Sequence, residues 1–74
     1  MAKRVIDGRC KIIGQNIKRY REEKGWTQEG LAEKANIHVS YVGQIERGLR
    51  YPSLKVLFRI ADVLMIEAEK IFKA

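Results

Sequence analysis

Cysteine and histidine are scarce in this sequence of 74 residues, and their scarcity excludes several classes of site. The single cysteine, Cys10, cannot form a disulfide within the chain. A metal site needs several ligands, so we predict no metal ion and interpret Cys10 as a small apolar core residue in a reducing compartment. With one histidine, His38, and no phosphate-binding glycine loop, the chain does not resemble an enzyme, and we expect no cofactor.

Long hydrophobic runs are also absent. No apolar stretch approaches the roughly 18 residues that a membrane-spanning helix needs. The basic N-terminus, MAKRVIDGRCK, lacks the apolar stretch that follows in a secretory signal. There is no repeat, low-complexity tract or internal linker, and a chain of this length makes one domain at most. We therefore expect a cytoplasmic protein with a flexible basic arm at residues 1–9 and one domain at residues 10–74.

Positive charge is in excess and unevenly spread. The formal net charge is +6, and residues 1–24 contribute most of it, with eight Lys or Arg against three acidic residues. A basic chain suggests an anionic partner, either nucleic acid or a membrane surface. The basic residues that precede residue 25 are accompanied by Glu22 and Glu23, which makes a membrane-binding basic helix the weaker interpretation.

Turn-forming residues divide the chain into short segments whose apolar residues recur with a helical period. We predict five helices and no strand, hence an all-α fold. Their expected boundaries are Cys10–Lys24, a segment after Thr27 that ends at Asn36, His38–Arg47, a segment after Ser53, and Glu67–Lys73. The residues expected to face the core are Ile13, Ile17, Tyr20, Leu31, Ala32, Ala35, Val42, Ile45, Leu54, Leu57, Ile60, Ala61, Leu64, Ile71 and Phe72.

The second and third predicted helices are separated by only about three residues, which is typical of a helix-turn-helix unit. Thr27 and Ser53 can cap helices with their hydroxyl groups. Asn36 and Gly48 stand where left-handed residues end helices. The short turn forces a large angle between the two helices, so the third can protrude.

Three motifs carry a resemblance to a known family: Gly25-Trp26-Thr27-Gln28, Leu31-Ala32, and Ile45-Glu46-Arg47-Gly48 followed by Pro52-Ser53-Leu54. Residues 12–72 resemble the lambda-repressor-like, Cro/repressor-type helix-turn-helix domains of the XRE family. His38, Tyr41 and the IERG stretch are similar to the controller proteins of restriction–modification systems. The resemblance implies a five-helix DNA-binding domain and a sequence-specific transcriptional regulator of prokaryotic or phage type, associated with the nucleoid.

The third helix is the expected reader of double-stranded DNA, because an α-helix fits the major groove. Gln44 can pair with an adenine edge through two hydrogen bonds, and Val39 can pack on a thymine methyl. A solvated helix face is the alternative for the polar residues, a helix-start role for His38, and ring packing for Tyr41. The predicted base contacts are His38, Val39, Ser40, Tyr41, Gly43 and Gln44.

Phosphate contacts are expected beside that helix, where they fix register without reading sequence. The resemblance implies that Gln28, at the start of the second helix, bonds a phosphate, and helix N-termini favour anions on their own account. The alternatives are plain surface roles for Gln28 and Arg50. The predicted phosphate contacts are Asn16, Gln28, Arg47 and Arg50.

The resemblance also implies a structural role for Arg21 and Glu46, as a partly buried ion pair that joins the first helix to the third. Three positions depart from the family pattern. Gly30 removes half of a capping box. Gly43 weakens the third helix by about 1 kcal/mol relative to Ala, or permits a close approach of DNA. Met65 stands in place of the usual glycine between the last two helices.

Apolar residues remain on the fourth and fifth predicted helices after the core is filled. A continuous apolar patch on a small protein suggests a partner surface, and a two-fold homodimer would cover it with its own copy. The alternative is that these side chains complete a small core under the N-terminal arm. The predicted interface residues are Val56, Phe58, Val63, Met65, Ile66 and Ile71.

A second class of function is a protein-interaction module on the same fold, such as the antitoxin of a toxin–antitoxin pair. Nothing in the sequence resembles an added toxin-binding segment, which argues against that interpretation. We expect double-stranded DNA and a second copy of the chain as partners, with no small-molecule ligand and no membrane.

Overall fold

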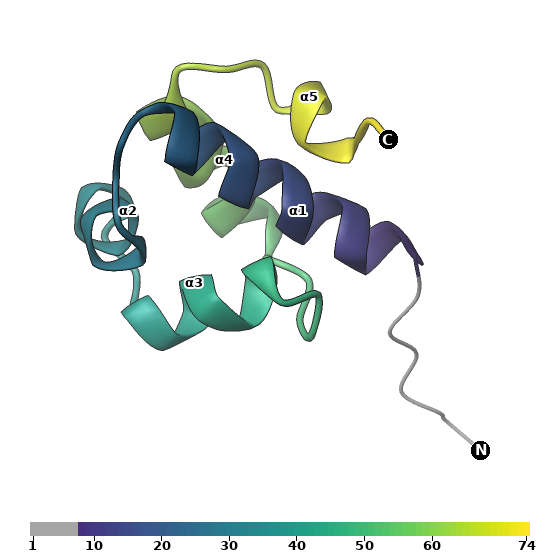
Figure 1. The fold of residues 1–74 in the computed structure, drawn as a ribbon, viewed down its shortest axis with the longest axis horizontal. Coiled ribbons are helices and arrows are strands. Elements are labelled where there is room, and N and C mark those ends of the chain that lie inside the picture. Colours follow the sequence, from purple (N-terminus) through teal and green to yellow (C-terminus); the bar gives the residue numbers. More distant parts are fainter. Residues whose placement is uncertain (1–7) are drawn as a thin grey trace.

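The computed structural model describes residues 8–74, in which five helices and no strand are present, as the all-α prediction requires (Figure 1). The helices are α1 (Gly8–Glu23), α2 (Gln28–Ala35), α3 (Val39–Glu46), α4 (Leu54–Leu64) and α5 (Glu69–Phe72). Residues 1–7 of the predicted arm lie outside the described residues, and its last two residues belong to α1. Among the helices of residues 8–74, none combines the length and the hydropathy needed to cross a bilayer.

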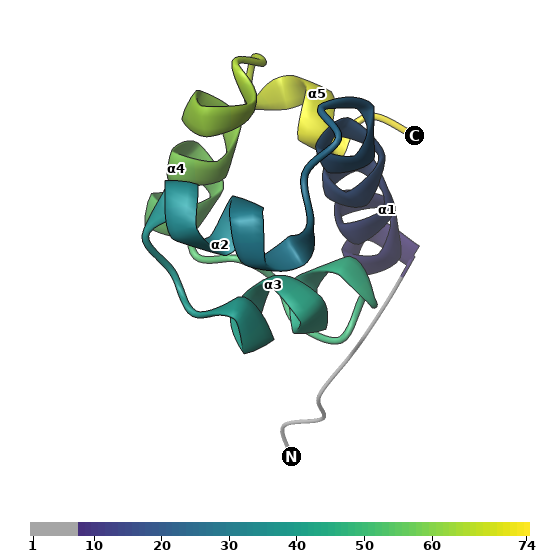
Figure 2. The same ribbon diagram turned by 60° about the vertical axis from the view of Figure 1, so that its left-hand side comes forward.

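Helix α1 lies at the centre of the arrangement. It packs against α3 on one side and against α5 on the other, as both views show (Figures 1 and 2). Helix α2 packs against α3 and α4. This arrangement leaves α3 at one edge of the molecule, opposite α5, with one of its faces turned outward. The side chains that are fully buried where the helices meet are Cys10, Ile17, Leu31, Val42, Ile45, Ile60, Leu64 and Ile71.

The predicted caps of α2 and α4 and the predicted end of α2 are confirmed by their hydrogen bonds and backbone angles, whereas α5 begins two residues later than predicted. The Thr27 hydroxyl accepts from the Gly30 backbone N–H at 3.0 Å, and the Ser53 hydroxyl accepts from the Val56 backbone N–H at 3.2 Å. Asn36 ends α2 with a φ of 58°, in the left-handed region. Met65 ends α4 in the same conformation, with a φ of 60° and no glycine to relieve it.

The side of α4 that is turned toward the core differs from the prediction in the first turn of the helix. Leu54 is 69% exposed, although it was expected in the core, and Val56 is only 8% exposed, although it was expected at an interface. The buried residues of α4 are Val56, Leu57, Ile60, Ala61 and Leu64, so its buried stripe begins within the first turn but does not include Leu54. In α5, Ile71 is buried as expected, whereas Phe72 is 51% exposed.

Candidate nucleic-acid interface

The edge of the molecule formed by α2 and α3 carries most of the predicted DNA-contacting residues. A short turn at residues 36–38 joins the two helices. Behind α3, the backbone of α1 approaches so closely that a side chain on Gly14 would collide with the carbonyl oxygen of Ile45. Helix α1 therefore supports the C-terminal end of α3 directly, with no side chain between the two backbones at that point.

At the start of α3, His38 is the N-cap residue. Its Nδ1 accepts a hydrogen bond from the Ser40 backbone N–H at 3.1 Å, and the Ser40 hydroxyl lies 2.9 Å from the same nitrogen. In the free protein, His38 therefore has the helix-start role that was the alternative to a base contact. Both residues are exposed, and Val39 beside them is half-buried. The beginning of α3 therefore presents two polar side chains to solvent, while Val39 packs partly against the core.

Farther along α3, Tyr41 is held by the residues that follow the helix. Its hydroxyl accepts a hydrogen bond from the Ser53 backbone N–H at 3.0 Å. The Arg50 guanidinium lies 4.4 Å from the centre of the Tyr41 ring, a cation–π contact. Arg50 Nη1 also donates to Gln44 Oε1 at 3.4 Å. The structure thus brings the predicted phosphate contact Arg50 beside two predicted base contacts.

A hollow of about 440 Å³ lies at the C-terminal end of α3, between the helix and the segment that follows it. Gln44, Arg47, Leu49 and Arg50 line it. The two arginines are donors only, and none of the four side chains is acidic. This hollow therefore suits hydrogen-bond acceptors with negative charge, such as phosphate oxygens and the acceptor atoms of base edges.

Leu49 is a surface residue of this region that the sequence did not single out. It is 47% exposed and lines the hollow between the two arginines. Its position next to Gly48, just past the helix, was the only signal in the sequence. An exposed leucine among cationic side chains can pack on a sugar or a thymine methyl.

Arg21 and Glu46 form the expected ion pair between α1 and α3. Arg21 Nε donates to Glu46 Oε2 at 2.7 Å and Arg21 Nη2 donates to Glu46 Oε1 at 3.0 Å, which is the strong two-pronged arrangement. Both side chains are buried, with exposed fractions of 9% and 2%. The hydrogen bonds that Arg21 donates to the Glu46 carboxylate raise the pKa of Arg21 above its usual value, so the guanidinium keeps its charge.

Gln28 joins this pair from the start of α2. Its Nε2 donates to Glu46 Oε1 at 3.0 Å. The Gln28 oxygen lies over Gly43, where an added Cβ would be 3.7 Å from it and 3.5 Å from Arg47 Nη1. Gly43 is consequently buried beneath these two side chains, which corrects its prediction as a base contact.

Asn16 is a second correction. Its side chain is only 9% exposed, and its Nδ2 donates to the carbonyl oxygens of Ile71 at 2.8 Å and Lys73 at 2.6 Å. Asn16 therefore fastens the C-terminal segment to α1. It is engaged at the α5 side of α1, away from α3, so it is not placed for a phosphate contact.

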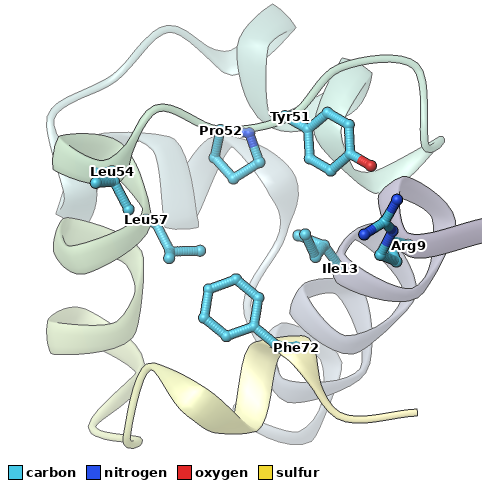
Figure 3. A pocket seen from close by; sticks show the side chains of 7 residues that line it. All are labelled: Arg9, Ile13, Tyr51, Pro52, Leu54, Leu57 and Phe72. Carbon is cyan, nitrogen blue, oxygen red and sulfur yellow. The ribbon is translucent and has the colours of Figure 1, made fainter. Parts of the chain in front are cut away.

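A different surface is formed by α4, α5 and the loop before α4. Seven side chains from α1, that loop, α4 and α5 surround a hollow of about 460 Å³ (Figure 3). Its members include the exposed residues Leu54 and Phe72, whereas Phe58 and Met65 line another hollow at the end of α4. Of the residues predicted for a dimer interface, Phe58 and Met65 are exposed and Val63 and Ile66 are half-buried.

Val56 and Ile71 are corrections to that predicted interface. They are 8% and 0% exposed and belong to the core. Val56 faces inward from the first full turn of α4, and Ile71 closes the core from α5. Neither side chain has much surface left to offer to a second copy, so the exposed apolar residues Leu54 and Phe72 replace them on this surface.

The chain matches a known protein family and several known relatives. A family model described as helix-turn-helix matches residues 17–71. The transcriptional regulator YazB of Bacillus subtilis is 46% identical over 62 residues, which cover 84% of this chain and 90% of YazB. SinR of Bacillus subtilis, another transcriptional regulator, is 48% identical over 54 residues, covering 72% of this chain and 49% of SinR. The chain thus spans about half the length of SinR.

Solved structures agree with the sequence relatives. The restriction–modification controller protein C.AhdI from Aeromonas hydrophila superposes with a TM-score of 0.82 at 38% identity, covering 85% of this chain and 96% of that one. SinR in complex with DNA superposes with a TM-score of 0.79 at 42% identity, covering 82% of this chain and 98% of that one. The prediction of a lambda-repressor-like helix-turn-helix fold, with its likeness to controller proteins, is confirmed.

Proposed function

Because the chain belongs to the helix-turn-helix family of DNA-binding transcriptional regulators, we propose that it binds a specific sequence of double-stranded DNA with α3 in the major groove. The observation that carries this proposal is the hollow at the end of α3, whose polar lining is Gln44, Arg47 and Arg50, without an acidic side chain. In the major groove, such donors face phosphate oxygens and the acceptor atoms of bases. Catalysis forms no part of the proposed role.

Base readout falls to the outer side of α3. Gln44 is the foremost reader: its amide can donate to and accept from an adenine edge, and its oxygen has a second lone pair beside the one that Arg50 uses. We assign the partly exposed side of Val39 to a thymine methyl, and Ser40 and His38 to bases or phosphates near the start of the helix. Tyr41 supports Arg50 through its ring.

Phosphate contacts on either side of α3 fix the register. Arg47 and Gln28 are adjacent over Gly43, and the N-terminus of α2 adds backbone N–H groups that favour an anion. The net charge of +6 supplies long-range attraction to DNA. A protein that uses these contacts releases counterions on binding, so its affinity depends on salt.

A salt titration tests this part of the proposal. Affinity for duplex DNA is expected to fall linearly in log–log form as salt rises, and Arg47→Ala should reduce the slope by about one. Lys70→Ala is the matched control: this lysine is exposed on α5, and its loss should leave the slope nearly unchanged. A salt-independent affinity would remove the DNA-binding proposal.

We further propose that the chain acts as a homodimer on a palindromic operator in the cytoplasm, at the nucleoid. The supporting observation is the apolar surface of α4 and α5, where Leu54, Phe58, Met65 and Phe72 are between 51% and 76% exposed. A two-fold partner would cover this surface with its own copy. Two copies of α3 would then read half-sites about 34 Å apart.

Sedimentation at tens of micromolar tests the dimer. Phe58→Glu introduces a charge that the joined apolar surfaces would have to desolvate, so it should weaken association at least about ten-fold. Gln15→Glu adds the same charge on the exposed side of α1 and should leave association unchanged. A wild-type chain that stays monomeric throughout this range would exclude this dimer.

A further inference from the structure

Gly43 lies beneath the Gln28 side chain without being required by it, because a Cβ added at Gly43 would be in ordinary van der Waals contact with Gln28 Oε1, at 3.7 Å. A glycine in the middle of α3 weakens the helix, and sequence reasoning left open whether it admits DNA or only softens the helix. In the structure the Gln28 side chain extends from the start of α2 across Gly43, and its Nε2 reaches Glu46 at 3.0 Å. Gln28 therefore covers Gly43 while its amide nitrogen is bonded to Glu46.

Glu46 is the fixed end of this arrangement. Its Oε1 accepts from both Arg21 Nη2 and Gln28 Nε2, each at 3.0 Å, and its Oε2 accepts from Arg21 Nε at 2.7 Å. Arg21 is anchored again through Nη1, which donates to the Trp26 carbonyl oxygen at 2.7 Å. The carboxylate thus cannot turn without breaking several hydrogen bonds, whereas Gln28 is half-buried and approaches from the solvent side.

A primary amide has two N–H donors on its nitrogen. Glu46 takes one of those on Gln28, and this bond fixes the direction of the other. We infer that Glu46, held by Arg21, is a positioning residue that aims the second N–H of Gln28 at a DNA phosphate. This inference rests on the proposed function, and it assigns to the buried ion pair a role in binding beyond its role in folding.

The test combines Gln28→Ala with replacement of the ion pair. In the wild-type chain, Gln28→Ala should weaken binding to duplex DNA about ten-fold, the lower end for a hydrogen bond to a charged group. Since Gln28 is neutral, the salt slope should stay unchanged. Gln15→Ala, which removes an exposed glutamine from α1, is the matched control and should have no effect.

The decisive background is Arg21→Met with Glu46→Leu, which replaces the pair by apolar side chains and keeps the interior packed. In that background Gln28 has no Glu46 carboxylate to bond to, so Gln28→Ala should lower the affinity for duplex DNA by less than about two-fold. Glu46→Gln is the conservative background, because an amide oxygen in the place of Oε1 can still accept from Gln28 Nε2 and Arg21 Nη2, whereas its amide nitrogen gives up only the bond from Arg21 Nε. In it, Gln28→Ala should again cost about ten-fold.

The outcomes separate the inference from the proposed function. A ten-fold cost of Gln28→Ala in both the wild-type and the Arg21→Met/Glu46→Leu backgrounds would overturn the positioning role while DNA binding stands. No cost in the wild-type chain would overturn it as well. A wild-type chain that fails to bind DNA in any salt would instead overturn the proposed function, and the inference with it.

Discussion

The edge formed by α2 and α3 and the surface formed by α4 and α5 differ in how their outer side chains are held. At the first, Gln28 is bonded to Glu46, and Arg50 is stacked on Tyr41. At the second, Leu54 and Met65 project with 69% and 76% of their surface exposed. Polar side chains that are oriented in advance suit a rigid polyanion, whereas exposed apolar side chains gain free energy only when another apolar surface covers them.

The small core supports these two regions in different ways. Helix α1 presses on α3 at Gly14 and holds Glu46 through Arg21, so the reading edge is fixed from behind. On its other side α1 holds the C-terminal segment through Asn16. Substitutions at the two regions should therefore affect folding stability, base readout by α3 and dimer formation separately.

The largest effect is expected at the buried ion pair. Arg21→Met leaves the Glu46 carboxylate without its main partner and should lower the free energy of unfolding by about 3 kcal/mol. Adding Glu46→Leu should restore much of the loss. Chemical denaturation of the wild-type chain, the two single variants and the double variant can show this. Lys18→Met, an exposed position of the same helix, is the control and should change stability by less than about 0.5 kcal/mol. Simple additivity of the two single losses would contradict coupling between Arg21 and Glu46.

Gln44→Ala addresses readout. It should cost about 1–3 kcal/mol on the best DNA site and relax the preference at one base pair, because a two-pronged base contact is lost. Non-specific affinity and the salt slope should remain nearly unchanged. Equal losses on specific and non-specific DNA would show that Gln44 does not read a base.

A smaller effect of opposite sign is expected at the end of α4. Met65 adopts a left-handed conformation with a φ of 60°, which costs a side chain with a Cβ about 1 kcal/mol. Its side chain is 76% exposed in the free chain, so Met65→Gly should stabilise the monomer by about that amount in urea denaturation. Asn36→Gly, at the matching end of α2, should gain only a few tenths, because asparagine tolerates this conformation. A loss of stability in Met65→Gly would show that its side chain packs.

Local features could be predicted from the sequence because their causes are local. The caps at Thr27 and Ser53 and the left-handed Asn36 need only neighbouring residues, and each is present. The helix-turn-helix followed from spacing and motifs in the same way. The core positions of α1 to α3 were readable because polar residues separate the apolar ones.

The remaining features depend on packing between distant segments. In LKVLFRIADVL, the charged residues Lys55, Arg59 and Asp62 occupy one side and every other position is apolar, so periodicity alone could not decide between Leu54 and Val56 as the first buried position. Asn16 bonds to a carbonyl group 55 residues away, for which no local pattern exists. The bond from Gln28 to Glu46 joins residues 18 positions apart and forms only when α2 and α3 are both in place.

Sequence-specific reading by α3 can be tested by selecting binding sites from a random pool of duplex DNA. We expect enrichment of one sequence made of two inverted half-sites, with centres about one helical turn apart. The Gln44→Ala protein should then enrich the same palindrome with one base pair of each half-site relaxed. A pool that shows no enriched sequence after repeated rounds would contradict sequence-specific reading by α3.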